Sequence, residues 1–107
     1  MISKETENKI LNFRDSRNWK QYHNGKDLAI SISLEANELL EIFQWSADDL
    51  DRTERIEKIE EELADVLIYC QMIADYYKLD IDNIISKKLI KNLEKYPENK
   101  EIDLKNK

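Results

Sequence analysis

Apolar residues recur at helical spacing along four stretches of the chain, and polar or turn-forming residues separate these stretches. We therefore expect four helices, over roughly residues 3–22, 27–45, 51–78 and 83–96. The last one repeats an apolar residue at every fourth position and stops at Pro97. The pattern predicts an all-α fold in a single domain over residues 1–97. A charged tail follows at residues 98–107, and we expect it to be frayed.

Turn and capping residues mark the ends of the predicted helices. Asn24-Gly25 indicates a turn before the second helix, and the polar stretch "SADDLD" predicts a short loop before the third. The predicted N-terminal caps are Asp27, Asp51 in a capping box with Glu54, and Asp80 or Asp82. The 107 residues include only one glycine and one proline, which argues against turn-rich β folds and glycine-rich phosphate loops.

Two acidic residues interrupt the apolar surface of the third predicted helix. Between residues 63 and 77 this helix is apolar almost all round, as is typical of a central helix or one covered by another subunit. Glu62 and Asp65, one turn apart, each project between large apolar side chains on the helical wheel. Their position needs an explanation, because burying an isolated carboxylate is costly.

The second predicted helix carries a similar pair. Glu35 falls inside the apolar arc, between Leu28 and Ile42, and Glu38 lies one turn later at its edge, whereas Glu41 is expected to be exposed. A short loop joins the two helices, so they are expected to be antiparallel neighbours. All four carboxylates would then meet in one small volume.

Four converging carboxylates repel one another, and two remedies are available. Protons could neutralise some of them, or divalent cations could bind among them. An all-oxygen ligand set suits hard ions, namely Mg²⁺ or Mn²⁺. The competing interpretation of each acid taken alone is an ordinary solvated helix face.

Composition narrows the classes of function. Charged residues make up 37% of the chain and the net charge is −6, which argues against binding to nucleic-acid polymers. Cys70 is the single cysteine, which excludes an intrachain disulfide and fits a reducing compartment. The sequence predicts neither a signal peptide nor a membrane span, so we expect a cytoplasmic protein.

Several motifs in order give the chain its resemblance to a known family. "EANELLEIFQW" is followed by "EELADVLIY" and then by a lysine, an asparagine and "KYP", with "RNWKQYHNGKDLAISISLE" upstream. This set resembles the MazG-type nucleotide pyrophosphohydrolases, and in particular their dCTP-pyrophosphatase branch. The resemblance implies an all-α fold of the four-helix-bundle type, assembled as a homodimer or homotetramer in which a neighbouring subunit completes the site.

The resemblance also implies an activity and a set of site residues. The activity is Mg²⁺-dependent hydrolysis of a nucleoside triphosphate, expected to be a dCTP-like deoxynucleotide, to the monophosphate and pyrophosphate. The implied metal ligands, which are also the catalytic residues, are Glu35, Glu38, Glu62 and Asp65. Glu38 is the carboxylate we expect to orient the attacking water. The implied nucleotide-binding residues are Trp19, His23, Trp45, Tyr69, Lys88 and Asn92.

Other functions remain open at the level of sequence. The chain has too few histidines and cysteines for a nucleophilic constellation, so a covalent intermediate is not expected. The alternative to an enzyme is a non-catalytic helical bundle that binds metal or nucleotide as a sensor or interaction protein. The preferred base, and whether the nucleotide is normal, modified or damaged, are not predicted.

Overall fold

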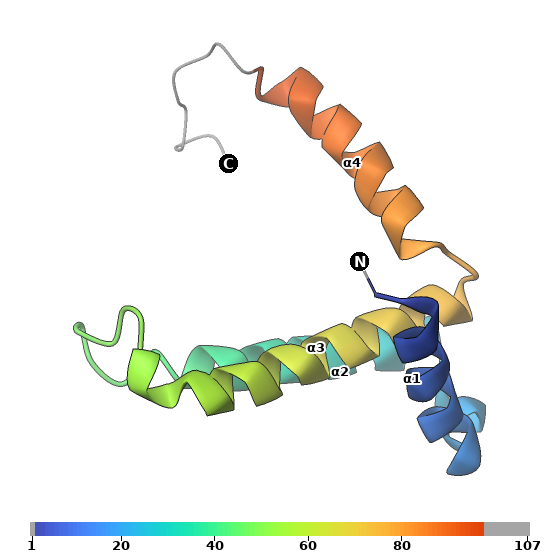
Figure 1. Cartoon of the computed structure of the whole chain (residues 1–107), viewed down its shortest axis with the longest axis horizontal. Helices are drawn as coiled ribbons and strands as arrows, with labels where there is room; N and C mark the ends of the chain where they lie inside the picture. Colours follow the sequence, from blue (N-terminus) through green and yellow to red (C-terminus); the bar gives the residue numbers. More distant parts are fainter. Residues whose placement is uncertain (1, 98–107) are drawn as a thin grey trace.

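The computed structural model describes residues 2–97, and all regular secondary structure in that part of the chain is helical (Figure 1). The long helices are α1 (Lys4–Ser16), α2 (Gly25–Glu41), α3 (Ile56–Tyr76) and α4 (Ile81–Lys95). Two short 3₁₀ helices precede α2 and α3, at Trp19–Tyr22 and Thr53–Arg55. The predicted all-α fold class is confirmed, whereas the predicted tail, residues 98–107, lies outside the described residues.

The first predicted helix is broken in two. Ser3 caps α1 by accepting a hydrogen bond from the Thr6 N–H at 3.1 Å. The helix ends at Ser16, and Asn18 then adopts a left-handed conformation with φ of 56°. Asparagine tolerates this conformation better than most residues, so it separates α1 from the 3₁₀ helix that carries Trp19. The prediction of one continuous helix over residues 3–22 was therefore wrong.

The second helix begins and ends earlier than predicted. Asn24, not Asp27, is its cap: the Asn24 Oδ1 accepts from the Asp27 N–H at 2.8 Å, and the Asn24 Nδ2 donates to the Asp27 carboxylate at 2.9 Å. This reciprocal pair starts the helix at Gly25. The helix ends at Glu41, so Trp45 lies beyond it in the connection to α3.

The predicted capping box at Asp51 does not form, and α3 begins only at Ile56. Arg52 has a left-handed backbone with φ of 47°, which interrupts the helical path between Asp51 and Glu54. The Arg52 side chain holds this turn by pairing with Asp49 at 2.7 Å and with Glu54 at 3.0 Å. Of the two caps proposed for α4, the structure selects Asp80, which accepts from the Asn83 N–H at 2.9 Å.

The molecule is built on an antiparallel hairpin of α2 and α3, with α1 crossing one end of it (Figure 1). A small core of Ile10, Leu28 and Met72 joins these three helices, and the partly buried Ile68 and Ile73 pack against it. Buried Arg14 ties α1 to α3 by donating to Asp75 at 2.6 Å, and it also donates to the neighbouring Asp15 at 2.8 Å (a side chain on its own helix). These contacts fix α1 beside the C-terminal part of α3.

The fourth helix stands away from the other three (Figure 1). None of its residues is buried, and it does not pack closely along any other described helix. Its exposed large apolar residues are Ile84, Ile85, Leu89, Ile90 and Leu93. The described chain therefore does not close a four-helix bundle on its own. Within residues 2–97, the structure contains no helix with the length and apolarity needed to cross a bilayer.

Candidate active site

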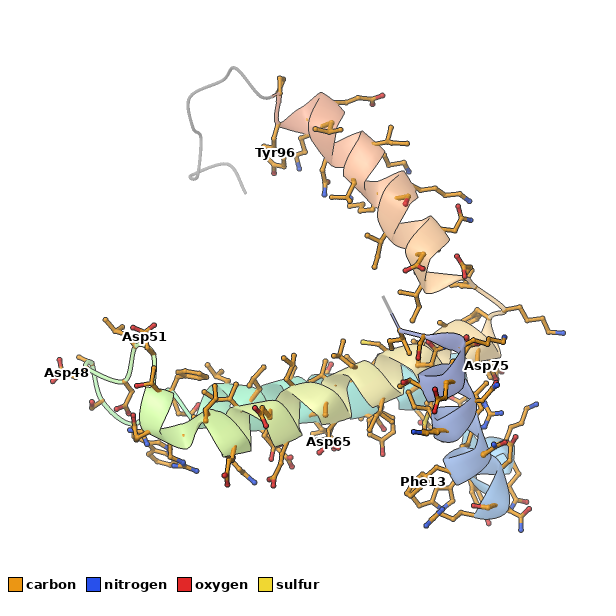
Figure 2. The ribbon with its side chains drawn as sticks, in the orientation of Figure 1. Phe13, Asp48, Asp51, Asp65, Asp75 and Tyr96 are labelled. Atoms are coloured by element: carbon orange, nitrogen blue, oxygen red, sulfur yellow. The ribbon has the colours of Figure 1, made fainter. Side chains whose placement is uncertain are left out.

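Three carboxylates meet halfway along the α2–α3 hairpin. Glu35 of α2 and Glu62 and Asp65 of α3 each offer an oxygen, and these oxygens lie within 4.8 Å of one another. Figure 2 shows Asp65 near the middle of α3, well separated from Asp48 and Asp51 in the loop at the end of the hairpin. The antiparallel packing of α2 on α3 brings the two acid pairs to similar heights along the hairpin.

Glu38, the fourth predicted acid, lies against the same group. Hydrogen bonding to Glu62 and the negative charge of Glu35 raise the pKa of Glu38 to about 7. The metal-free cluster therefore holds a proton close to neutral pH. The two remedies named for converging carboxylates, a proton and a cation, thus compete at this position.

The cluster contains buried oxygen atoms without hydrogen-bond partners. Glu62 is only 5% exposed, and its Oε2 and the Oε2 of Glu35 are both buried and have no hydrogen-bond partner while Glu38 is ionised. The other oxygen of Glu62 accepts from Lys58 at 2.9 Å, and this contact lowers the pKa of Glu62. Buried unpaired carboxylate oxygens are costly, and a hard divalent cation satisfies them. The residues present therefore fit Mg²⁺ or Mn²⁺.

A cleft of about 640 Å³ opens beside the acids. Glu35 and Asp65 form part of its wall, and most of the remaining wall is apolar. The aromatic residues that line it are Phe13, Trp19 and Tyr69. A largely apolar cleft with a few polar groups at one side is the usual form of a small-molecule site.

The aromatic wall of the cleft comes from two directions. Phe13 and Trp19 pack edge to face with ring centroids 5.4 Å apart, and the Arg17 guanidinium lies 3.6 Å from the Phe13 centroid. Figure 2 shows where Phe13 sits on α1. Tyr69 enters from α3, one turn beyond Asp65. Burial and the negative charges of Glu35 and Asp65 raise the pKa of Tyr69, so its hydroxyl stays protonated and can donate.

His23 lines a smaller cavity of about 280 Å³ that shares Trp19 and Tyr69 with the cleft. Burial, with a further contribution from the positive charge of Arg14, lowers the pKa of His23. The imidazole is therefore neutral at pH 7 and has one donor and one acceptor nitrogen. Asp27 and Ser31 of α2 add two polar side chains to the wall of this cavity.

The remaining predicted nucleotide-binding residues do not meet the cluster within this chain. Trp45 is 71% exposed in the α2–α3 connection and lines neither cavity. Lys88 and Asn92 lie on α4, which stands away from the hairpin (Figure 1). The structure thus brings together the four acids with Trp19, Tyr69 and His23, and leaves the other three residues apart.

Three features of the site escaped the sequence analysis. Phe13 was not among the predicted site residues, yet it forms part of the cleft wall. The ion pair between Arg14 and Asp75, which positions that wall, joins residues 61 positions apart and has no local signal. Lys58 lies four residues before Glu62, a spacing that predicts an ion pair, but so common a pattern gave no reason to single it out.

Comparison with known proteins supplies a family. The sequence model of the MazG-like family matches residues 30–107, which include all four acids. The chain belongs to the MazG-like family. The resemblance drawn from the ordered motifs is thereby confirmed.

Relatives of this MazG-like chain include curated enzymes. It is 31% identical to dCTP pyrophosphatase 1 of Rattus norvegicus over 90 residues, and 33% identical to dCTP pyrophosphatase 1 of Homo sapiens over 91 residues. Each alignment covers 79% of this chain and 53% of the relative, so the chain spans about half the length of these proteins.

A solved structure also resembles the MazG-like chain. It is the crystal structure of a pyrophosphatase from Archaeoglobus fulgidus, with a TM-score of 0.78 and 44% sequence identity. The match covers 88% of this chain and 91% of that one. The similarity therefore extends over nearly the whole helical architecture.

Proposed function

We propose that this chain is a Mg²⁺-dependent nucleoside triphosphate pyrophosphohydrolase. The observation that carries the proposal is the position of the carboxylate group, with its unpaired buried oxygens, at the wall of an aromatic cleft. Such a site can hold the charged and the aromatic halves of a nucleotide at once. Membership of a family whose enzymes generally depend on divalent metals, and the names of the curated relatives, support the same activity.

Glu35, Glu62 and Asp65 would hold the metal ion, with Glu38 beside them. When bound, Mg²⁺ supplies neutralisation of the triphosphate charge and stabilises the charge that develops during transfer of the phosphoryl group. Mn²⁺ would suit the same oxygen ligands. The orphaned Oε2 atoms of Glu35 and Glu62 are the atoms we assign to the ion.

Glu38 is the residue we assign to the attacking water. The oxygen of this water forms a bond to the α-phosphorus, the bond from that phosphorus to the bridging oxygen breaks, and pyrophosphate leaves. The water proton passes to the Glu38 carboxylate, which lies against Glu35 and Glu62 and acts as the general base. The products are a nucleoside monophosphate and pyrophosphate.

The cleft would bind the base and sugar. Stacking on an aromatic side chain stabilises a base by about 1–3 kcal/mol, and Trp19 and Phe13 offer such surfaces at the cleft wall. The Tyr69 ring lines the cleft together with Glu35 and Asp65, and its bulk there would disfavour a ribose 2′-hydroxyl. We therefore propose a deoxynucleoside triphosphate, with dCTP as the first candidate from the names of the relatives.

The active form is proposed to be a homodimer or homotetramer. The fully buried core is small, while apolar residues such as Leu34, Leu40 and Leu63 are at least 45% exposed on the hairpin. Burying these residues and the apolar side of α4 against a second copy would remove a large apolar area from water. In that assembly α4 would carry Lys88 and Asn92 to the site of another subunit.

A substrate panel tests the proposal. Deoxynucleoside and ribonucleoside triphosphates, including dCTP and methylated-cytosine analogues, are incubated with Mg²⁺, and pyrophosphate and monophosphate are measured. We expect both products in equal amounts from at least one deoxynucleotide, and their loss in Glu38→Gln. Tight nucleotide binding without turnover would instead support a sensor, and the absence of both Mg²⁺ and nucleotide binding would support a structural bundle.

A further inference from the structure

A lysine ammonium is already bound to the acid cluster. The Nζ of Lys58 lies 2.9 Å from Oε1 of Glu62, one turn away on α3. The side chain of Glu62 is 7% exposed, whereas that of Lys58 is 47% exposed. This contact therefore differs from an ordinary surface ion pair, because the carboxylate end is buried within the acid group.

The contact neutralises only part of the cluster. Oε2 of Glu62 is buried and unpaired, as is Oε2 of Glu35 across the hairpin. Lys58 thus supplies one positive charge to a group of four carboxylates, and it leaves free the oxygens we assign to a metal. A divalent ion bound there would lie close to the lysine ammonium, and the two cations would repel each other.

From this geometry we propose that Lys58 is a built-in counter-ion, which stabilises the metal-free acid cluster and opposes the divalent ion when it binds. The proposal rests on the metal site of the proposed function, and it concerns the free energy with which that site binds the divalent ion. Lys58 offsets the repulsion among the carboxylates in the metal-free cluster. Its positive charge also lowers the affinity of the cluster for the divalent ion.

Lys58 also has a place to move. Oε2 of Glu61 lies 3.8 Å from Nζ, and the Glu61 side chain is 70% exposed on the outer surface of α3. The flexible lysine stem allows the ammonium to swing toward Glu61 without any change in the helix. The exchange of Glu62 for Glu61 as partner moves the positive charge outward when the divalent ion enters.

The test compares Lys58→Met with the wild type in two measurements. Isothermal titration with MgCl₂ gives the dissociation constant for the ion without any nucleotide, and thermal unfolding in EDTA gives the stability of the metal-free chain. Lys26→Met is the matched control: it removes the same charge from an exposed site about 14 Å along α2 from Glu35, at 1.5 Å per residue. Lys58→Arg keeps the charge and should behave like the wild type.

We expect Lys58→Met to strengthen Mg²⁺ binding and to destabilise the metal-free chain. The variant should bind Mg²⁺ about 3- to 10-fold more tightly, because the competing charge is gone. Its melting temperature in EDTA should fall by about 4 °C or more, and saturating Mg²⁺ should restore most of the loss. Lys26→Met should change the Mg²⁺ dissociation constant by less than about twofold, since solvent and salt screen a charge so far away.

Other outcomes overturn the proposal in distinguishable ways. A higher dissociation constant in Lys58→Met would mean that the lysine orients Glu62 for the metal, and an unchanged one would make the contact a surface ion pair without a role. If Lys58→Met fails to fold, Lys58→Gln gives the same comparison with a polar side chain. If the wild type binds no Mg²⁺, the proposed metal site itself fails, independently of Lys58.

Discussion

The bond between Arg14 and Asp75 fixes the aromatic wall of the cleft, and its loss should uncouple nucleotide binding from metal binding. Arg14 is 4% exposed and connects α1 to α3 through the 2.6 Å contact with Asp75. Phe13 is its neighbour in sequence, and Trp19 follows a few residues later. The acids lie on α2 and α3, which pack directly against each other.

The size of the effect of Asp75→Ala follows from the burial of Arg14. Removing one partner of a buried charged donor costs about 1–3 kcal/mol of unfolding free energy. Asp15 still accepts from the Arg14 Nε at 2.8 Å, which places the expected loss in the lower part of that range. For a domain of this size, a loss of about 1–2 kcal/mol lowers the melting temperature by about 4–16 °C.

The assay measures urea unfolding, the Mg²⁺ dissociation constant and the KM for dCTP, or for the best nucleotide of the panel, on the same protein. We expect the KM to rise severalfold because α1 is no longer held against α3. The Mg²⁺ dissociation constant should change by less than about twofold, since separate sites act nearly independently. Asp15→Ala is the control: its carboxylate is 52% exposed, so its removal should lower the urea unfolding midpoint much less than Asp75→Ala does.

Two results would refute this reasoning. If Asp75→Ala loses no more stability than Asp15→Ala, the bond to Arg14 does not hold α1. If Mg²⁺ binding weakens as much as nucleotide binding, the cleft wall and the acid cluster are not independent units. The double variant Arg14→Met with Asp75→Ala should regain part of the stability, because it leaves no charged group buried without its partner.

Three further predictions concern the site and its frame. Contacts with Glu62 and Glu35 raise the pKa of Glu38 to about 7, so the contribution of Glu38 to stability is complete below pH 4.5 and lost as the pH rises through 7. The melting temperature in EDTA should therefore fall over this window. If the melting temperature of Glu38→Gln falls as steeply, the assignment is contradicted. Trp19→Ala should weaken nucleotide binding by about 1–3 kcal/mol in a fluorescence titration, with Trp45→Ala as the comparison; equal losses would deny Trp19 a special role. A Cβ at Gly25 would lie 2.9 Å from the Tyr77 ring carbon Cζ and overlap its hydroxyl, so Gly25→Ala should lower the melting temperature, and Tyr77→Phe in the same chain should partly restore it.

The helical wheel located the acid cluster because its spacing is set by the helix itself. Glu35 and Glu62 stood out as carboxylates within apolar arcs, and the antiparallel hairpin then fixed which acids face each other. These relations need only the period of the helix and a connection that reverses the chain. The all-α fold class followed from the same periodicity and from the scarcity of glycine and proline.

The errors arose where a backbone conformation or a distant contact decides the structure. Asn18 and Arg52 turn left-handed and shift the ends of two helices, which propensities along the sequence do not reveal. Asn24 is the cap instead of Asp27, because the Asn24 side chain accepts from the Asp27 N–H and donates to the Asp27 carboxylate. Lys88 lies apart from the acids because α4 does not pack along the hairpin, and the helical pattern of α4 does not specify its direction.

The isolation of α4 has a consequence for the spectroscopy of this protein. A lone helix of 15 residues is marginal in water, since packing supplies most helical stability in proteins. The circular dichroism of the chain should therefore depend on its own concentration: at high dilution the signal of these 15 residues fades while the hairpin keeps its share. The circular dichroism signal then measures the self-association of the chain.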